Sequence, residues 1–272
     1  MPPGSEHLSA ERIQAGVASR QFGRTIYCLD RVDSTNIFAR RRAEQGANEG
    51  ELVFAEEQTQ GKGRLGRTWF SPPHLNLYFS LILRPEFGAA QASHITLMAA
   101  VALAETLECV LSDPPEIKWP NDILVRGHKL AGILTESSCE GTRIRFVILG
   151  IGVNVNVPSE LMPVAIRESA TSLFQVTGRE FDRNHLAALL IQGLERCYKE
   201  LAGAGFAALA ARWERYFQLK GRPIQVQMLD QITYGTAMGI DADGALIIRD
   251  QEGVTRRVLA GDVIPLTLSP CC

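Results

Sequence analysis

The hydrophobic residues of this chain follow one pattern up to about residue 220 and another after it. In the first part, short apolar runs bounded by glycine, proline or charged residues predict strands at 25–29, 52–56, 76–83, 123–125, 129–135 and 145–157. Apolar positions that recur every three or four residues predict helices at 36–45, 92–112, 184–202 and 205–216. A further short helix is expected at 10–20, with Ser9 as its N-cap.

After Lys220 the pattern predicts short strands only. They are expected at 224–228, 234–240, 245–249 and 255–259, with a tail at 263–266. Asp243-Gly244 is a tight-turn signal between two of them. A segment of this size made of short strands predicts a small β-barrel, SH3-like in size. We therefore predict an α+β protein with an N-terminal extension at 1–24, a large domain at 25–220 and a barrel at 221–272.

Composition and charge narrow the class of protein. Of the 272 residues, 46% are hydrophobic and 21% are charged, which is typical of a globular protein with a real core. The formal net charge of −2 is not that of a nucleic-acid-binding chain, so basic residues matter only locally. The longest apolar stretch, 95–111, contains Glu105 and Glu108 and is short for a membrane span.

The cysteines and the N-terminus indicate a compartment. No CxxC pair and no Cys/His cluster with zinc spacing occurs among Cys28, Cys109, Cys139, Cys197, Cys271 and Cys272. This usage favours reduced thiols, and the N-terminus lacks the basic start and apolar core of a signal peptide. We expect a cytoplasmic protein with no membrane or nucleic-acid partner.

The densest candidate for chemistry is the Gly-rich loop, residues 58–69, which reads QTQGKGRLGRTW. Glycine lets a backbone approach a ligand closely, and amide and guanidinium groups suit phosphate or carboxylate oxygens. In this loop the glycines alternate with cations and an indole follows, at Gly61, Lys62, Gly63, Arg64, Gly66, Arg67 and Trp69. The loop does not match the P-loop pattern. Taken alone it fits an anion site or a solvated basic loop.

Three other segments carry polar groups whose roles the residues leave open. Ser34 and its neighbours are good N-cap types, and a helix N-terminus with hydroxyl groups can also hold a carboxylate or a ureido group. Lys129 lies in a hairpin, where it is either solvated or turned inward as a functional group. Gly150 and Gly152 interrupt an apolar strand where a ligand or another backbone could approach.

Together these segments resemble the biotin protein ligases, also called biotin–[acetyl-CoA-carboxylase] ligases. The matching segments, in order along the chain, are DSTN at 33–36, GKGRLGRTW at 61–69, KWPNDI at 118–123, KLAGILTE at 129–136 and GIGVNVN at 150–156. The resemblance implies a mixed-sheet catalytic domain of the biotin/lipoate ligase type followed by the SH3-like barrel. Because few residues precede the first strand, we expect the form that lacks an N-terminal DNA-binding domain.

The resemblance also implies a two-step reaction. Biotin is activated with ATP to biotinyl-5′-AMP, and biotin then passes to a lysine of a biotin carboxyl carrier protein. That acceptor belongs to acetyl-CoA carboxylase or to another biotin-dependent carboxylase. Mg²⁺ is expected with ATP, although no cluster of metal ligands is legible in the sequence. Family members use an exposed sheet edge to dimerise, so a homodimer is possible.

The site residues implied by the resemblance fall into three overlapping groups. The catalytic residues are Lys129, Arg64 and Asp122, of which Asp122 is a candidate to deprotonate the incoming lysine. The biotin site comprises Ser34, Thr35, Asn36, Gln58, Gly61, Lys62, Arg64, Lys129 and Gly132, with Ser34, Thr35 and Gln58 bonded to the ureido head. The nucleotide site comprises Arg64, Arg67, Trp69, Lys118, Asn121, Asp122, Lys129 and Asn154, with Trp69 packed on adenine.

The chain departs from the family pattern at two loop positions, and two alternative functions stay open. Lys62 and Leu65 stand where many relatives carry arginine, so loop closure or retention of the intermediate is expected to differ somewhat. One alternative is a lipoate or octanoate ligase, which shares the catalytic architecture. The other is a non-catalytic biotin sensor. The KWPND segment and the Gly-rich loop favour biotin ligation.

Overall fold

A computed structural model describes residues 6–18, 21–228 and 231–266, so Cys271 and Cys272 lie outside the described residues. Its main feature is a seven-stranded sheet with the strand order β1-β2-β3-β7-β6-β5-β4. The strands are β1 (Ile26–Val32), β2 (Leu52–Gln58), β3 (Leu77–Leu83), β4 (Glu116–Lys118), β5 (Asp122–Val125), β6 (His128–Glu140) and β7 (Arg143–Val153). β1 and β2 are parallel and the other neighbours are antiparallel, which confirms the predicted mixed sheet.

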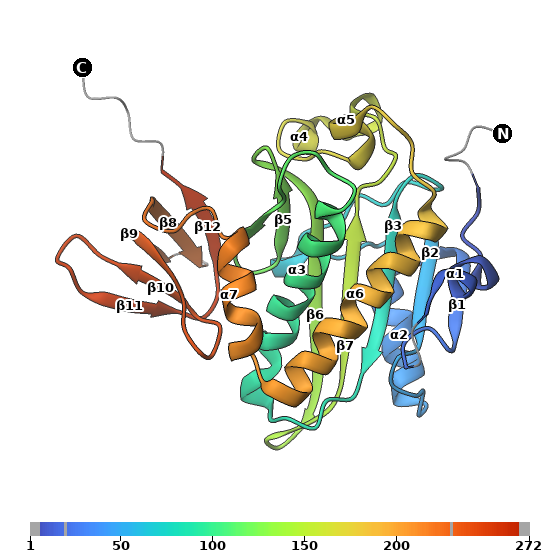
Figure 1. Ribbon diagram of the computed structural model, residues 1–272, viewed down its shortest axis with the longest axis horizontal. Helices are drawn as coiled ribbons and strands as arrows, with labels where there is room; N and C mark the ends of the chain where they lie inside the picture. The colour runs from blue at the N-terminus through green and yellow to red at the C-terminus, as the bar shows by residue number, and fades with distance from the viewer. Residues whose placement is uncertain (1–5, 19–20, 229–230, 267–272) are drawn as a thin grey trace.

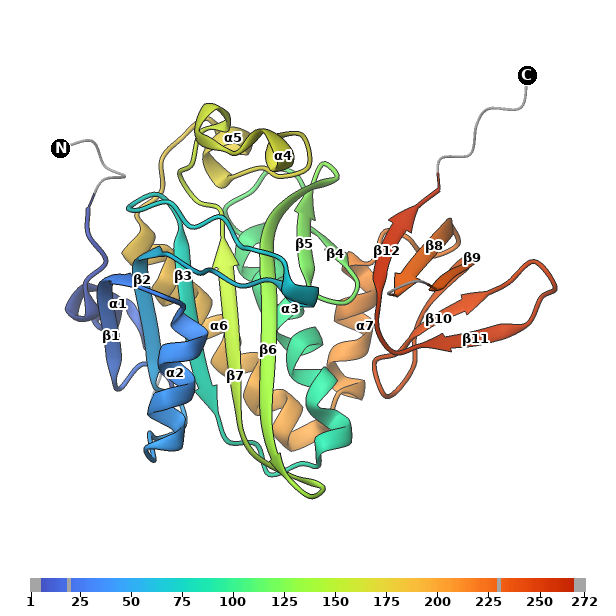
Figure 2. The same ribbon diagram turned by 180° about the vertical axis from the view of Figure 1, so that it is seen from behind.

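Helices cover the two faces of this sheet unequally. One face is covered by α3 (Ala92–Glu108) and α6 (Arg183–Ala204), with α7 (Ala207–Tyr216) beside them (Figure 1). On the opposite face α2 (Thr35–Glu44) lies over the β1–β3 side of the sheet, and the Gly-rich loop crosses the remainder (Figure 2). The remaining helices are short, namely α1 (Ala10–Gly16), α4 (Val164–Arg167) and α5 (Leu173–Thr177), with 3₁₀ turns η1 (Arg64–Gly66), η2 (Ala89–Gln91) and η3 (Ser159–Leu161).

The two apolar layers follow from the two-residue period of the strands. Along β7, Val147, Leu149 and Ile151 belong to the large core cluster that includes α3 and α6. The alternate residues Phe146 and Ile148 belong to the smaller cluster that includes the alanines of α2. Both layers therefore pack in register against one sheet, and that fixes the position of α2.

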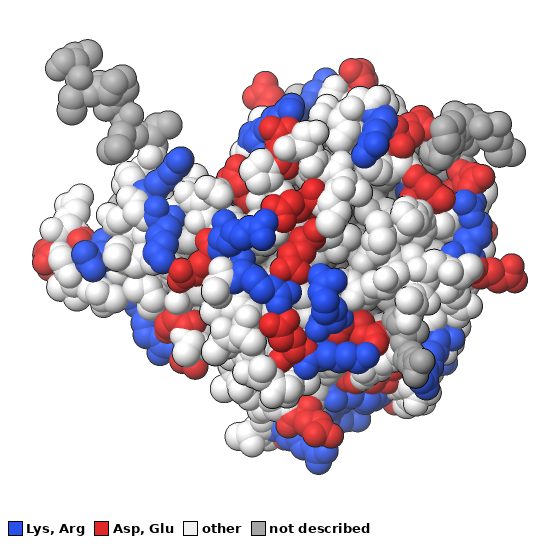
Figure 3. All heavy atoms as spheres, viewed as in Figure 1, with Lys and Arg blue, Asp and Glu red and all other residues white. Residues whose placement is uncertain are grey.

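Acidic and basic side chains alternate across the face that α3, α6 and α7 cover (Figure 3). Arg212 of α7 donates to the Glu105 carboxylate of α3 at 2.7 Å, and Arg196 of α6 donates to the same carboxylate at 2.9 Å. Exposed ion pairs of this kind contribute little individually. Here they join three helices around one carboxylate.

The chain ends in a second sheet, which is five-stranded and antiparallel with the order β11-β10-β9-β8-β12. Its strands are β8 (Pro223–Met228), β9 (Gln231–Ile240), β10 (Leu246–Arg249), β11 (Thr255–Val258) and β12 (Asp262–Pro265). Within the described residues the two outer strands β11 and β12 are not paired with each other. Closure of this sheet into a barrel therefore stays a prediction.

The C-terminal sheet is fixed to the rest of the molecule by its turn at Asp243-Gly244. The indole nitrogen of Trp119 is buried and donates to the Gly244 carbonyl at 3.1 Å. His94 Nε2 lies 3.0 Å from the Ala242 carbonyl oxygen. Because Trp119 immediately precedes Pro120 and Asn121, this contact also holds in place the segment for which the sequence predicts a nucleotide site.

Several elements differ in length from their predicted ranges. The predicted helix 92–112 ends at Glu108, and the predicted helix 10–20 ends at Gly16 although Ser9 does accept a hydrogen bond from Arg12 N–H as its cap. β7 ends at Val153, and beyond it Val155 N–H donates to the side-chain oxygen of Asn76 at 2.8 Å and not to a backbone carbonyl of β3. In the part of the chain described, no helix combines the length and apolar character needed to span a bilayer.

Candidate active site

The face of the sheet that α2 leaves uncovered carries a pocket. The lining residues come from α2, the Gly-rich loop, the β5–β6 hairpin, β7, the segment 166–170 and β12. They are Ser34, Thr35, Asn36, Gln58, Lys62, Gly63, Arg64, Arg67, Thr68, Trp69, Phe70, Asn121, Asp122, Lys129, Gly132, Ile133, Leu134, Gly150, Ile151, Gly152, Asn154, Ile166, Ser169, Ala170 and Asp262. Thus segments far apart in the sequence meet at one concave surface.

Glycines form the floor of this pocket. On β7 the residues that face α2 change from Phe146 and Ile148 to Gly150 and Gly152, which removes the side chains from that part of the sheet. A Cβ at Gly132 of β6 would come 2.8 Å from the Trp69 ring, and one at Gly152 would come closer still. Larger residues at these positions would therefore expel the indole.

The N-terminus of α2 is held by a hydrogen-bonded network. Thr35 donates to Gln58 Oε1 from its backbone N–H at 2.9 Å and from its hydroxyl at 3.1 Å. The buried Ser80 hydroxyl donates to Asn36 Oδ1 at 2.6 Å, and Asn36 donates to Glu136 at 2.7 Å. Ser34 occupies the N-cap position without a capping bond from its side chain. Its hydroxyl is therefore not committed to the helix cap.

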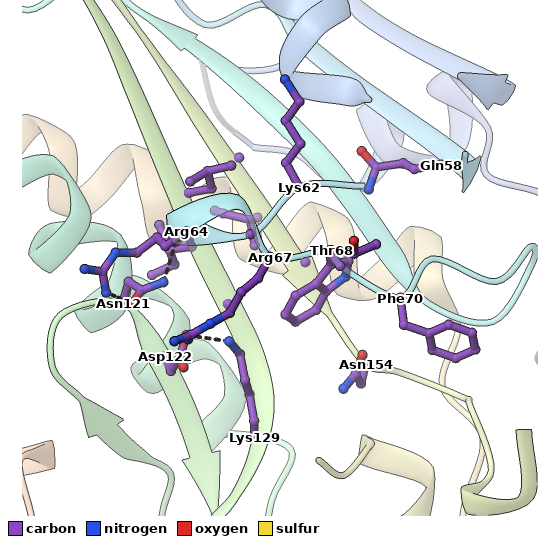
Figure 4. Close-up of a pocket in the computed structure, with 18 of the residues that line it drawn as sticks. Gln58, Lys62, Arg64, Arg67, Thr68, Phe70, Asn121, Asp122, Lys129 and Asn154 are labelled. Carbon is purple, nitrogen blue, oxygen red and sulfur yellow. Dashed lines mark hydrogen bonds and ion pairs between the residues drawn. The ribbon is translucent and has the colours of Figure 1, made fainter. Parts of the chain in front are cut away.

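Lys129 points into the pocket and pairs with Asp122 (Figure 4). Its Nζ lies 2.7 Å from Asp122 Oδ1 and 5.2 Å from the centre of the Trp69 ring. The two residues come from adjacent strands of one hairpin, and a bulge between Ile123 and Leu124 shifts the pairing between them. The sequence left open whether Lys129 is solvated or turned inward, and in the structure its side chain is turned inward.

Arg64 lies between the pocket and the C-terminal sheet. Its Nη1 donates to Asn121 Oδ1 at 2.9 Å, and its Nη2 donates to the Gly261 carbonyl at 3.4 Å. Burial lowers the pKa of Arg64, an effect that the nearby Asp262 and Asp122 carboxylates partly oppose. The guanidinium is thus a desolvated cation whose position is fixed by neutral acceptors, so it is available to an anionic ligand.

The Gly-rich loop is ordered across the pocket. Gly63 N–H donates to the Arg67 carbonyl at 2.7 Å, and Trp69 N–H donates to the Gly61 carbonyl at 2.9 Å. Arg67 also donates to the Asp262 carboxylate of β12. Leu65, one of the two departures from the family pattern, is 58% exposed with φ 55° and makes the loop's outer corner.

Some predicted site residues are not part of the pocket lining. Gly61 is a buried residue of the loop, and a Cβ there would meet the Trp69 carbonyl oxygen at 2.6 Å. Lys118 lies on β4 and does not line the pocket. Lys62 is among the lining residues, but its amine points away from the group formed by Arg64, Arg67 and Lys129 (Figure 4). The other predicted residues all line the pocket.

Sequence reasoning missed Asp262 and the segment 166–170. The segment lies beside Lys129 because Lys129 N–H donates to the Ser169 carbonyl at 2.8 Å, and Thr171 N–H donates to the Lys129 carbonyl at 2.9 Å. Neither region carries a local motif.

Metal ligands do not converge in this pocket among the residues described. Its carboxylates, Asp122 and Asp262, are each paired with a cation. A group of histidine and carboxylate side chains close enough to share an ion lies outside this pocket.

Two family patterns match the chain. The biotin/lipoate A/B protein ligase family matches residues 28–154, and the biotin protein ligase C-terminal domain matches residues 220–264. The first match contains the pocket's Gly-rich loop, its hairpin and its glycine floor. The second contains Asp262.

Similar proteins of known name or structure cover most of the chain. The bifunctional ligase/repressor BirA of Bacillus spizizenii is 37% identical over 94% of this chain and 78% of its own length. The biotin–[acetyl-CoA-carboxylase] ligase of Paracoccus denitrificans is 37% identical over 83% of this chain and 94% of its own length. The biotin protein ligase from Aquifex aeolicus, solved in complex with biotin and ATP, superposes with a TM-score of 0.77. It is 29% identical and covers 89% of this chain and 99% of its own.

Proposed function

The chain belongs to the biotin/lipoate A/B protein ligase family, and we propose that it is a biotin–protein ligase that uses ATP and forms biotinyl-5′-AMP. The observation that carries the proposal is the grouping of Arg64, Arg67 and Lys129 over a glycine-floored pocket. The names of the relatives and the biotin and ATP complex of the Aquifex aeolicus protein support biotin as the substrate.

The first half-reaction joins two anions, and this pocket suits it. A biotin carboxylate oxygen attacks the α-phosphorus of ATP, the bond to the β-phosphate oxygen breaks, and pyrophosphate leaves with the electron pair. Cations fixed in a desolvated site stabilise the charge that develops in such a transition state. Lys129 and Arg64 supply those charges, and Arg67 of the loop adds a third.

Biotin is proposed to bind at the α2 end of the pocket. Ser34, Thr35 and Gln58 present hydroxyl and amide groups there, and the Ser80–Asn36–Glu136 network holds the helix end that carries them. The ureido head of biotin carries both N–H donors and a carbonyl acceptor, which matches this mixed set. Gly150 and Gly152 leave space beside these groups for the ring system.

The nucleotide is proposed to bind at the hairpin end. Asn121, Asp122 and Asn154 line this part of the pocket together with Arg64. Trp69, which also lines the pocket, is proposed to pack on the adenine. Mg²⁺ is expected to arrive with ATP and to offset the phosphate charge. Lys118, outside the lining, is the weakest member of the proposed nucleotide set.

The second half-reaction transfers biotin to a carrier protein. The amine of an acceptor lysine attacks the biotinyl carbonyl carbon, the bond to the AMP phosphate oxygen breaks, and the amine loses a proton. Asp122 is proposed to take that proton, since its carboxylate faces the pocket. The acceptor is proposed to be a biotin carboxyl carrier domain.

We further propose that the chain divides into an N-terminal extension at 1–24, a catalytic domain at 25–220 and a C-terminal domain at 221–272. A cytoplasmic location is proposed as well, with a homodimer as a possible assembly.

Biotin-dependent exchange of pyrophosphate into ATP by the purified chain tests the first half-reaction. Lipoate serves as the parallel substrate, and Lys129→Ala serves as the control variant. Exchange with biotin that the variant lacks supports the proposal. Exchange with lipoate alone would keep the mechanism and overturn the substrate. Exchange with neither, from a folded preparation, would overturn the catalytic assignment.

A further inference from the structure

Three side chains from distant parts of the chain meet outside the pocket. His7 precedes α1, Glu56 lies on β2, and His74 lies in the loop between Phe70 and β3. Their potential ligand atoms all lie within 4.8 Å of one another. His74 Nδ1 is 3.4 Å from Glu56 Oε2, and His7 Nδ1 is 3.8 Å from Glu56 Oε1. Among the described residues this is the one group of three or more histidine, cysteine or carboxylate side chains close enough together to hold a metal ion.

The Glu56 carboxylate is rigidly held by hydrogen bonds. It is buried, and it accepts hydrogen bonds from Arg183 Nη1 at 2.6 Å on Oε2 and from Leu8 N–H at 2.6 Å on Oε1. Arg183 Nη2 adds a bond of 3.3 Å to Oε1.

The same bonds leave one acceptor position on Glu56 unused. A carboxylate oxygen accepts about two hydrogen bonds. Oε1 takes Leu8 N–H and Arg183 Nη2, whereas Oε2 takes only Arg183 Nη1. The free position is therefore on Oε2, the oxygen nearest to His74.

His74 is held so that its Nδ1 faces this position without bonding to it. The nitrogen is buried and has no hydrogen-bond partner among the described residues, although Oε2 is only 3.4 Å away. The residue also has φ 63°, in the left-handed region that residues with a side chain seldom adopt. A buried imidazole nitrogen without a hydrogen-bond partner, facing a free acceptor position on a carboxylate, is the arrangement that a metal ion completes.

We propose that His7, Glu56 and His74 form a three-ligand site for a divalent transition-metal ion. Two imidazole nitrogens and one carboxylate oxygen are ligands that Zn²⁺ prefers, with water as the fourth. Nickel and copper ions also bind imidazole well, whereas Mg²⁺ and Ca²⁺ prefer oxygen ligands. Tetrahedral ligands at zinc distances are about 3.4 Å apart. The His74–Glu56 pair already has this spacing, and the exposed His7 has its Nδ1 3.8 Å from Glu56 Oε1.

The ion would join the N-terminal segment to the loop that follows the Gly-rich loop. His74 lies five residues after Trp69, and His7 is next to Leu8, which is itself bonded to Glu56. Because Arg183 already offsets the charge of Glu56, the ion is held less tightly than by an unshared carboxylate. We therefore expect reversible binding.

Metal binding by the full chain, made without a histidine tag, tests this site. Cys271→Ser and Cys272→Ser in all samples remove a thiol pair that would compete for zinc. Competition between the protein and a chromophoric zinc chelator gives stoichiometry and affinity. The test variants are His7→Asn and His74→Asn, since asparagine tolerates the backbone at 74. The matched control is His128→Asn, an exposed hairpin histidine whose Nδ1 lies 2.9 Å from the Arg126 carbonyl oxygen.

We expect one zinc ion per chain, with an affinity that falls by about tenfold or more in each test variant and stays unchanged in His128→Asn. Zinc should also raise the unfolding temperature of the parent chain, and EDTA should reverse the rise. In EDTA the variants should unfold like the parent, which separates loss of metal binding from loss of folding. Equal zinc affinity in the parent and either test variant, or no stoichiometric binding, would overturn the site and leave only histidine–carboxylate ion pairs.

Discussion

Arg67 of the Gly-rich loop donates a hydrogen bond to the carboxylate of Asp262, the first residue of β12. Arg64 Nη1 lies 3.8 Å from the other oxygen of the same carboxylate. One acidic residue of the C-terminal sheet therefore faces both arginines that are proposed to meet the phosphates. The sheet is thereby connected directly to the loop that covers the pocket.

Asp262→Asn should weaken closure of the loop without disturbing the fold. The Arg67 side chain is 62% exposed, so its pair with Asp262 is worth at most about 1 kcal/mol, or roughly a fivefold effect. We expect hydrolytic loss of enzyme-bound biotinyl-5′-AMP to accelerate by about that factor. Labelled biotin and a filter assay measure this loss.

The control for this variant is Asp243→Asn. Asp243 also pairs with an arginine, Arg257 of the C-terminal sheet, at 2.6 Å, but it is exposed and does not line the pocket. Retention of the intermediate should not change in the control. Equal retention in both variants would mean that Asp262 does not hold the loop. Deleting the whole sheet would be less informative, because it would also expose the buried Trp119.

Lys129→Ala should abolish most of the adenylation activity. The variant removes a cation that points into the pocket and leaves Asp122 without its partner. Loss of one fixed group that stabilises transition-state charge typically lowers the rate by about 10²-fold or more. Biotin-dependent pyrophosphate exchange measures the effect.

Lys62→Ala is the matched control for Lys129→Ala. Both residues line the pocket, but the Lys62 amine points away from the proposed reacting groups (Figure 4). We expect its exchange rate to stay within about threefold of the parent, the change that a screened charge produces. A loss as large as that of Lys129→Ala would mean that the loop turns Lys62 inward when ligands bind.

Gly152→Ala should displace the indole of Trp69. A methyl group at this position overlaps the Trp69 ring, so either the ring or the loop must move. Overpacking of this kind costs about 1–3 kcal/mol. We expect a red-shifted tryptophan emission and an exchange rate reduced by about tenfold or more, because the loop no longer lies on the glycine floor.

Gly203→Ala tests whether such effects are specific to the pocket. Gly203 lies near the end of α6, and a Cβ there meets nothing within 4 Å. Alanine should leave the exchange rate and emission unchanged and raise stability by up to about 1 kcal/mol. A normal exchange rate in Gly152→Ala would contradict the proposed role of the floor.

The sequence predicted the parts of the site that depend on local patterns. Strand periodicity placed Gly150 and Gly152 on one face of an apolar strand, where they form the pocket floor. The hairpin was predicted, and the structure adds that Lys129 on its second strand pairs with Asp122 on its first. The resemblance to a family then gave these residues a reaction, which residue patterns alone had left open.

Contacts between distant segments could not be predicted in the same way. Asp262 lies 195 residues after Arg67, and nothing in its local sequence indicates that it pairs with Arg64 and Arg67. His7, Glu56 and His74 likewise become neighbours only when the N-terminal segment packs beside β2. Helix ends were also overestimated, as at Glu108, because the apolar pattern of 92–112 continues beyond the last helical residue.

Glu56→Gln should destabilise the protein strongly at neutral pH. The variant leaves Arg183, whose side chain is 1% exposed, without an anionic partner in the core. Removal of one member of a buried ion pair typically costs about 3–5 kcal/mol. Urea unfolding at pH 7 in EDTA measures this cost, with exposed Glu11→Gln as the control, for which we expect a change of at most about 0.5 kcal/mol.

The difference in unfolding free energy between parent and Glu56→Gln should shrink in acid. The pKa of Glu56 in the folded protein lies below its ordinary value of 4.5, so its carboxylate stabilises the fold fully above that value. The stabilisation is lost as the pH falls through the lower, folded-state pKa, because both proteins then carry a neutral group beside Arg183. Other carboxylates titrate alike in both proteins and cancel. A difference that stays constant from pH 7 down to the acid limit of folding would show that the ionised form of Glu56 is not what stabilises this core.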